Sequence, residues 1–277
     1  MLKKSAYIIF ILMTFLFIFN YLLDLGDYSM SLGYHLLFVM LTLLMCLNKS
    51  KHKLLDLIIV IVSFIELLIF GSRGPVIPVA IFTIFMIIRL ITKIKRTELK
   101  ILLISILTAS SILGVIFFKD ILQLFVNLLN LLNIQSRSLR LFLNDLKYVS
   151  HRDELFVFIN ESIKKNWLFG TGITSDRLIT GVTYAHNIVL ELFVDFGVIF
   201  GTMPIIIFIY FLFKAIIKNK DKLVFIFFLL CVGLVPLFVS GSYLEQMWFW
   251  ILLGVIFKLN KKGDKKVVKG PKEKVNH

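Results

Sequence analysis

The chain has 277 residues, of which 58% are hydrophobic and 17% charged, and it carries a formal net charge of +14 at pH 7. Soluble domains are about 45–50% apolar, so this composition excludes an ordinary soluble domain and predicts a multi-pass membrane protein. The basic residues stand in short clusters between apolar runs, which indicates membrane topology rather than a nucleic-acid-binding face. Cys46 and Cys231 lie inside apolar runs, which predicts neither a disulfide framework nor a thiolate metal site.

Eight apolar runs are long enough for a helix, which rises about 1.5 Å per residue, to cross about 30 Å of hydrocarbon. We therefore expect an all-α fold with about eight transmembrane helices. The first run follows Lys3 and Lys4 as in a signal peptide, but it is too long and no small-residue cleavage site follows, so we expect it to remain as a helix. The runs are residues 6–23, 31–47, 54–70, 75–92, 100–118, 187–213, 223–240 and 243–258.

These runs predict four parts of the chain. We expect five transmembrane helices in residues 1–118, an extracytoplasmic loop in 119–186, three transmembrane helices in 187–258 and a basic cytoplasmic tail in 259–277. With the N-terminus in the cytoplasm, the cytoplasmic segments hold 22 of the 31 Lys and Arg residues. This excess predicts a cell-membrane protein with both termini in the cytoplasm, because cytoplasmic loops are enriched in Lys and Arg.

The connection formed by residues 119–186 is much longer than the others, and loops of that length usually have a function or a structure of their own. Apolar residues recur at helical spacing in residues 138–149 and 152–166, and residues 121–132 are apolar enough to lie in the membrane interface. We expect two or three helices on the outer membrane surface in this loop.

A short turn, Gly71-Ser72-Arg73-Gly74-Pro75, joins two predicted spans at the outer surface. A guanidinium at membrane depth is costly unless it is paired, so an ion pair between Arg73 and Glu66, up to about two helical turns below, is one interpretation. The other is an anion clamp, because arginine presents a fork of donors that matches phosphate oxygens and the neighbouring glycines let a ligand approach the backbone.

Arg152 begins a predicted amphipathic helix that ends at the turn Gly170-Thr171-Gly172. Its apolar face would anchor the helix on the membrane, which leaves Arg152 either as an ordinary solvated cation or as a ligand for an anion. His186 and Asn187 stand at the beginning of the apolar run of residues 187–213, between water and lipid headgroups. An imidazole with an ordinary pKa of about 6.5 can accept a proton near neutral pH, so His186 is a candidate general base, with a helix cap or interfacial anchor as the alternative.

The order of these motifs resembles the O-antigen polymerase and ligase superfamily, the Wzy-type integral membrane glycosyltransferases. The resemblance covers residues 71–201, about half of the chain. The chain departs from the family pattern in Trp167-Leu168-Phe169, where an Asn-Pro-Leu type of sequence is common, in Asp195, where Glu is commoner, and in its small number of spans. The matching motifs are Ser72-Arg73-Gly74, Arg152 with Gly170-Thr171-Gly172, His186-Asn187 and Asp195-Phe196-Gly197.

The resemblance implies a membrane glycosyltransferase that polymerises undecaprenyl-diphosphate-linked oligosaccharide repeat units into a surface polysaccharide, either a capsule or an O-antigen-like chain. The lipid-linked oligosaccharide would be both donor and acceptor, and the reaction would invert the anomeric centre without a cofactor, a nucleotide sugar or an essential metal. Arg73 and Arg152 would stabilise the charge that develops on the diphosphate, and His186 would act as the general base. The active site would lie on the extracytoplasmic face.

Four further residues are candidates for substrate binding. Ser72 and Asn187 belong to the motifs above, whereas Arg140 and Arg177 match no motif of the family and follow from their charge alone. The expected partners are membrane lipid, a chain-length regulator and a flippase, and no nucleic acid.

Three other functions stay open. A ligase would use the same donor but transfer the glycan to a lipid or wall acceptor, which the sequence does not distinguish. A transporter would need internal repeats or charges near the bilayer midplane, and the predicted spans contain few charged residues. A non-catalytic membrane scaffold would tolerate the loss of His186 and Arg73. Acidic residues inside predicted spans include Glu66, Glu191, Asp195 and Glu245.

Overall fold

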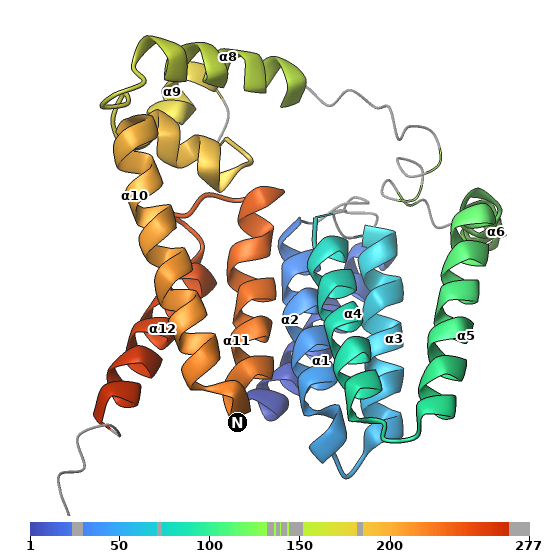
Figure 1. The fold of residues 1–277 in the computed structure, drawn as a ribbon. Coiled ribbons are helices and arrows are strands. Elements are labelled where there is room, and N and C mark those ends of the chain that lie inside the picture. Colours follow the sequence, from blue (N-terminus) through green and yellow to red (C-terminus); the bar gives the residue numbers. More distant parts are fainter. Residues whose placement is uncertain are drawn as a thin grey trace, which may run out of the picture. The chain divides into compact units, whose positions relative to one another are not determined.

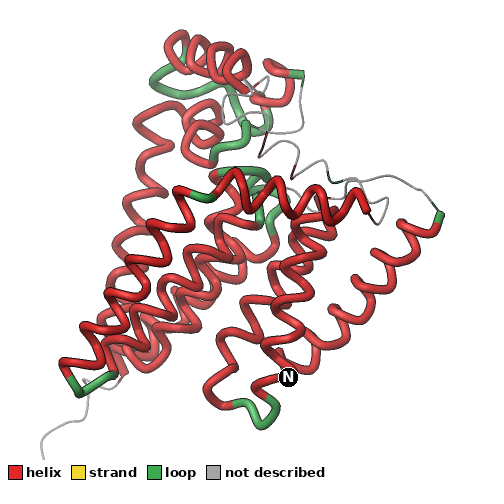
Figure 2. The backbone as a smooth tube through the Cα atoms, turned by 90° about the vertical axis from the view of Figure 1, so that its right-hand side faces the viewer, coloured by secondary structure: helices red, strands yellow, loops and turns green. Residues whose placement is uncertain are grey.

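The computed structural model describes residues 1–23, 30–70, 74–131, 136, 139, 143, 152–181 and 185–265 (Figure 1). The chain folds into two compact units, Met1–Ser150 and His151–His277. Every regular element in the described ranges is a helix, as Figure 2 shows. The predicted all-α fold is therefore confirmed for these residues.

The first unit is built around helix α2 (Met30–Cys46), which buries most of its side chains. It packs against α1 (Leu2–Leu22), α3 (Lys53–Phe70) and α4 (Val76–Lys93). The apolar character of these segments explains both their helical structure and their packing, since a helix that is hydrophobic on all sides is stable only when buried or in lipid. The other described elements of this unit are η1 (Leu47–Lys49), α5 (Thr97–Ile116) and α6 (Phe118–Leu131).

A buried polar cluster connects the beginning of α1 to the beginning of α3. The Asp56 side chain is 0% exposed, and its Oδ2 lies 2.8 Å from Nζ of Lys3. The hydroxyl of Tyr7 donates to the other carboxylate oxygen of Asp56, and Lys3 Nζ also donates to Oγ of Ser50 at 2.5 Å. A carboxylate is buried at low cost only when it is paired and hydrogen-bonded, so this cluster stabilises one arrangement of the two helices.

Replacing Lys3 with Met should destabilise the folded protein by about 1–3 kcal/mol, because the buried Asp56 then loses its cationic partner. The measurement is the melting temperature of the purified protein in detergent. Lys4→Met is the matched control, since Lys4 is exposed and its replacement removes the same charge. Equal melting temperatures for the two variants would show that the Lys3 to Asp56 ion pair contributes no stability.

The second unit packs α10 (Ile188–Lys218) against α12 (Met247–Lys265), and α8 (Arg152–Lys165) against α10. Its apolar segment at residues 223–240 is helical but irregular, because one turn of π-helix is followed by a 3-10 turn with Pro236 near its start. Such π-helical turns occur frequently at functional sites. The other elements of this unit are α9 (Ser175–Thr180), η2 (Lys220–Lys222), α11 (Leu223–Leu229), η3 (Leu230–Leu234) and η4 (Val235–Phe238).

Six described helical segments are long and apolar enough to cross a membrane. Two predicted spans, residues 54–70 and 243–258, correspond to α3 and α12, which are not in this group. Helix α3 contains Lys53, Asp56 and Glu66, and α12 begins only at Met247 and carries lysines in its second half. The six segments are Leu2–Asn20, Met30–Lys49, Val76–Lys93, Thr97–Ile116, Ile188–Lys218 and Lys220–Phe238.

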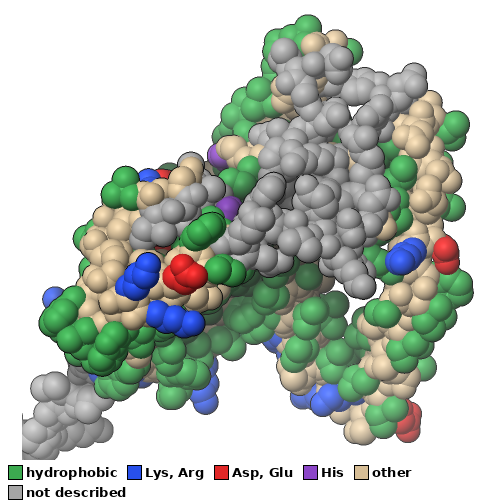
Figure 3. Space-filling model, turned by 90° about the horizontal axis from the view of Figure 1, so that it is seen from above, with side chains coloured by type: hydrophobic (Ala, Val, Ile, Leu, Met, Phe, Trp, Pro, Cys, Tyr) green, Lys and Arg blue, Asp and Glu red, His purple; other side chains and the backbone are tan. Residues whose placement is uncertain are grey.

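Large apolar side chains are exposed along most of these helices. Figure 3 shows hydrophobic side chains spread over the visible surface of the described residues, with Lys, Arg, Asp and Glu side chains only in small groups. Contiguous apolar surface of this extent is rare on soluble monomers and marks contact with lipid or protein. The exposure pattern thus agrees with a membrane protein.

The long connection before residue 187 contains helices in two of the predicted places. Helix α6 occupies the predicted interfacial segment at residues 121–132, and α8 occupies the predicted amphipathic segment at residues 152–166. The segment at residues 138–149 lies outside the described ranges, apart from Leu139 and Leu143. The short helix α9 has no counterpart among the predicted elements.

Candidate functional site

Helix α10 is interrupted at Gly197, whose φ of 77° and ψ of 169° are not helical. The helix changes direction there (Figure 1). The part after the break, residues 198–218, is long enough by itself to cross about 30 Å of hydrocarbon. The part before it, residues 188–196, is a separate short helix, here called the N-terminal arm. The predicted span of residues 187–213 corresponds to α10, which contains this break and continues to Lys218.

The break is stabilised by the turn that follows α8. A helix that ends leaves backbone carbonyl and amide groups without their usual partners, and buried groups of this kind must find others. Here the turn after α8 supplies them from its own backbone. The bonds run from Thr171 N to Val194 O (2.7 Å), from Gly172 N to Asp195 O (3.1 Å) and from Val198 N to Trp167 O (2.7 Å).

Two glycines make this close approach possible. Gly170 has a φ of 70°, and an added Cβ would lie 2.5 Å from the backbone N of Gly197. An added Cβ on Gly197 would lie 2.3 Å from the carbonyl oxygen of Leu168. Because both obstacles are backbone atoms, neither can move aside as a flexible side chain would. The structure thus brings together the predicted Gly170-Thr171-Gly172 turn and the Asp195-Phe196-Gly197 motif, which are separate in the sequence.

Asn187, and not His186, caps the N-terminal arm. Oδ1 of Asn187 accepts hydrogen bonds from the backbone N of Val189 at 2.9 Å and of Leu190 at 3.4 Å, the geometry of an N-cap. His186 is half-buried, with a φ of 57° in the left-handed region, where a residue with a side chain is strained by about 1–3 kcal/mol. The capping alternative for His186 is therefore wrong, and Asn187, a candidate for substrate binding, has a structural role.

Two buried carboxyl groups on the N-terminal arm hold the loop that leads into α12. Glu191 and Asp195, one helical turn apart, are only 1% and 2% exposed. Glu191 accepts hydrogen bonds from the hydroxyl of Ser242 and, at 3.3 Å, from the backbone N of Tyr243. Oδ2 of Asp195 accepts the hydroxyl hydrogen bond of Tyr243 at 2.8 Å. These bonds connect Glu191 and Asp195 with residues that stand 48 to 52 positions later in the chain.

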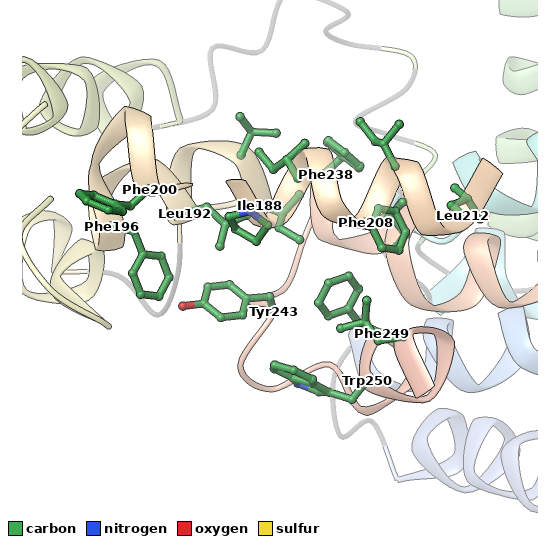
Figure 4. Close-up of a pocket in the computed structure, with 16 residues that line it drawn as sticks. Ile188, Leu192, Phe196, Phe200, Phe208, Leu212, Phe238, Tyr243, Phe249 and Trp250 are labelled. Atoms are coloured by element: carbon green, nitrogen blue, oxygen red, sulfur yellow. The ribbon is translucent and has the colours of Figure 1, made fainter. Parts of the chain in front are cut away.

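An apolar cavity of about 640 Å³ lies beside this cluster (Figure 4). Both parts of α10, the η3 and η4 turns and the beginning of α12 contribute to its wall. Side chains four residues apart point to one face of a helix, so the N-terminal arm presents a continuous apolar face to the cavity. Lining residues from the arm are Ile188, Val189, Leu192 and Phe196, and those from other segments include Phe200, Tyr243 and Trp250.

Helix α8 packs directly on the N-terminal arm. Leu155 and Ile159, one turn apart on α8, form a buried cluster with Val194 of the arm and with Ala185. The amphipathic pattern of residues 152–166 predicted an apolar face on this helix, but we expected that face to lie on the membrane, whereas Leu155 and Ile159 pack on the arm. Arg152 begins α8, as predicted, although its side chain lies outside the described residues.

Arg177, a candidate for substrate binding, has an acidic partner. Its Nη2 donates to Oε1 of Glu245 at 2.8 Å, which links α9 to the loop before α12. Burial raises the pKa of the neighbouring Asp176, while the backbone N–H groups of Arg177 and Ala185 act in the opposite direction.

Three candidate residues of the first unit, Ser72, Arg73 and Arg140, lie outside the described ranges. The predicted ion pair between Glu66 and Arg73 stays a prediction, because Arg73 lies outside the described ranges, whereas Glu66 is buried in α3. The residues of the site that the structure does describe therefore come from the second unit.

Ser242 and Tyr243 belong to the site but carried no signal in the sequence. They stand where an apolar run of residues 243–258 was expected to begin, and nothing local indicated a loop there. The only available signal was the presence of Glu191 and Asp195 in a predicted span, because acidic residues in a membrane segment usually face a protein partner.

Comparison of the chain with protein-family models, with curated proteins and with solved structures gave no match. Within the described ranges, no three His, Cys, Asp or Glu side chains come close enough together to hold a metal ion. The interpretation of the site consequently rests on its motifs and on their geometry.

Proposed function

We propose that the protein is a membrane glycosyltransferase that joins undecaprenyl-diphosphate-linked oligosaccharide repeat units into a surface polysaccharide. The observation that carries this proposal is the N-terminal arm of α10. One face of the arm lines an apolar cavity, its beginning carries His186 and Asn187, and its end is docked on the Gly170-Thr171-Gly172 turn. A lipid-linked sugar needs an apolar wall and a proton acceptor side by side.

The cavity has the properties that a polyprenyl chain requires. Its volume of about 640 Å³ lies within the range of about 300–1,000 Å³ that ligand sites usually have. Its wall is made largely of Leu, Ile, Phe and Val side chains, which favour hydrocarbon and exclude a hydrated sugar. Part of the lipid chain would occupy this cavity, and the diphosphate and sugar would lie towards the beginning of the arm.

The reaction requires a base and a means of stabilising the leaving group. The hydroxyl oxygen of the acceptor sugar attacks the anomeric carbon, the bond from that carbon to the phosphate oxygen breaks, and undecaprenyl diphosphate leaves with its electrons. His186 accepts the hydroxyl proton. Arg152, at the beginning of the helix that packs on the arm, and Arg73, in the Ser72-Arg73-Gly74 turn, stabilise the diphosphate. Attack opposite the leaving group inverts the anomeric configuration.

The same proposal includes the topology and the partners. The excess of Lys and Arg in alternate connections supports cytoplasmic termini and a site on the extracytoplasmic face of the cell membrane. A polymerase in that position would receive its lipid-linked substrate from a flippase, and a chain-length regulator would act on it as a partner. The proposed transfer reaction itself would need no nucleic acid, cofactor or metal.

Deleting the gene and analysing the lipid-linked oligosaccharides that accumulate tests this function. Loss of a polymerase should leave single repeat units on the lipid carrier and no long surface polysaccharide. Wild-type protein should restore the polymer, whereas His186→Ala at the same membrane level should not. Accumulation of long lipid-linked polymer would identify a ligase instead. Unchanged lipid-linked glycans would contradict both functions and favour a scaffold.

A further inference from the structure

The loop before α12 is held on the N-terminal arm through polar groups that the proposed chemistry does not use. Ser242 and Tyr243 both donate hydrogen bonds to carboxyl groups of the arm, Glu191 and Asp195. Each acidic side chain is almost completely buried. Burying two carboxyl groups one turn apart is costly unless both are paired, so the loop and the arm are stable only when they are correctly joined.

Tyr243 connects this polar cluster with the cavity. Its ring is part of the cavity wall, and in Figure 4 its hydroxyl oxygen points away from Phe249 and Trp250. That hydroxyl donates to Asp195. One side chain therefore takes part both in the cavity wall and in the attachment of the arm.

The N-terminal arm is then fixed from two sides. The Gly170-Thr171-Gly172 turn holds its end at Gly197, and the loop with Tyr243 holds Asp195 and Glu191. His186 directly precedes the arm, outside both attachments. Its position relative to the cavity consequently depends on the orientation of the arm.

We propose that Glu191, Asp195 and Tyr243 are positioning residues, which orient the N-terminal arm so that His186 stands at the end of the cavity. This inference rests on the proposed function only where it assumes that His186 takes part in the transfer reaction. It assigns the acidic residue of the Asp195-Phe196-Gly197 motif a hydrogen-bonding role, through Tyr243, instead of a role in direct contact with substrate.

The first test measures transfer by the purified protein in liposomes with its lipid-linked repeat unit, isolated from cells that lack the gene. Tyr243→Phe should lower kcat by roughly 10- to 100-fold with little change in KM, because a hydrogen bond to a carboxylate is lost while the lipid contacts stay. Asp195→Asn should stay near the wild-type rate, since the amide oxygen can still accept from Tyr243, whereas Asp195→Ala should be as slow as Tyr243→Phe. Tyr210→Phe is the matched control, because it removes the same hydroxyl from a tyrosine that lies exposed on α10.

The second test does not depend on the reaction. A single cysteine replaces Leu192, which lines the cavity from the arm and is buried, in a chain with Cys46 and Cys231 changed to Ala. The probe is a maleimide with a polyethylene glycol chain too large to enter the cavity. Its reaction with Leu192→Cys should be at least about tenfold faster when Tyr243→Phe is added, and unchanged when Asp195→Asn is added.

Each result decides the proposal. An Asp195→Asn variant as slow as Asp195→Ala would overturn it, because charge and not the hydrogen bond would then matter. A Tyr243→Phe variant with wild-type transfer and wild-type alkylation would overturn it as well. If the wild-type protein shows no transfer, the proposed function fails, while faster alkylation in Tyr243→Phe would still support the positioning of the arm.

Discussion

Replacing His186 with Gln should lower the rate of repeat-unit transfer by about 10²–10⁴-fold, the usual effect of losing a general base, with no loss of protein from the membrane. Glutamine retains hydrogen-bonding groups but cannot accept the proton of an attacking hydroxyl. The structure strengthens this prediction, because the cap of α10 is Asn187 and does not need the imidazole. Transfer in liposomes at equal protein level is the measurement.

The variant His186→Asn distinguishes the role of the imidazole as a base from the effect of the positive φ at this position. His186 has a positive φ, and Asn tolerates that conformation better than most residues, so this variant should fold at least as well as the wild type. It should nevertheless be as inactive as His186→Gln. Asn187→Asp is the companion control, because Asp also caps helices and should retain most activity if Asn187 is only a cap. Wild-type transfer by His186→Gln would end the assignment of His186 as the base.

Replacing Gly170 with Ala should separate the turn after α8 from the break in α10 and abolish transfer. The added Cβ would lie 2.5 Å from the backbone N of Gly197 and 2.6 Å from the carbonyl oxygen of Asp195, so the backbone itself would have to move. Crowding of this kind costs about 1–3 kcal/mol, in addition to the cost of placing Ala at positive φ. The melting temperature of the purified protein and its transfer rate are the two measurements.

Gly181→Ala provides the matched control for this prediction. Gly181 has a φ of 67°, close to the 70° of Gly170, but nothing lies within 4 Å of the added Cβ. Its replacement therefore introduces the same backbone strain without the collision. The difference between the two variants measures the contact alone, and an equal loss of stability in both would show that the turn and the break do not depend on close packing.

Local patterns in the sequence were sufficient to predict most of the helices. A run of apolar residues that is long enough for a membrane helix is recognisable without any knowledge of its neighbours, and the amphipathic spacing of Leu155 and Ile159 predicted the packing face of α8. Gly170 was also recognised as a turn residue, in the Gly170-Thr171-Gly172 turn that follows α8. These features depend on a few adjacent residues, which is why the sequence by itself determined them.

Only the tertiary structure decided how these pieces form a site. The sequence does not reveal the break at Gly197, because glycine also occurs inside unbroken membrane helices. The break is stable here because the turn after α8 forms hydrogen bonds with the backbone groups that the break exposes. The loop with Tyr243 looked like the start of a span, because its partner Asp195 lies 48 residues away in the chain. Interactions between residues so distant in the chain leave no local pattern in the sequence. The sequence therefore indicated Glu191 and Asp195 as unusual residues, and only the structure showed that they accept hydrogen bonds from Ser242 and Tyr243.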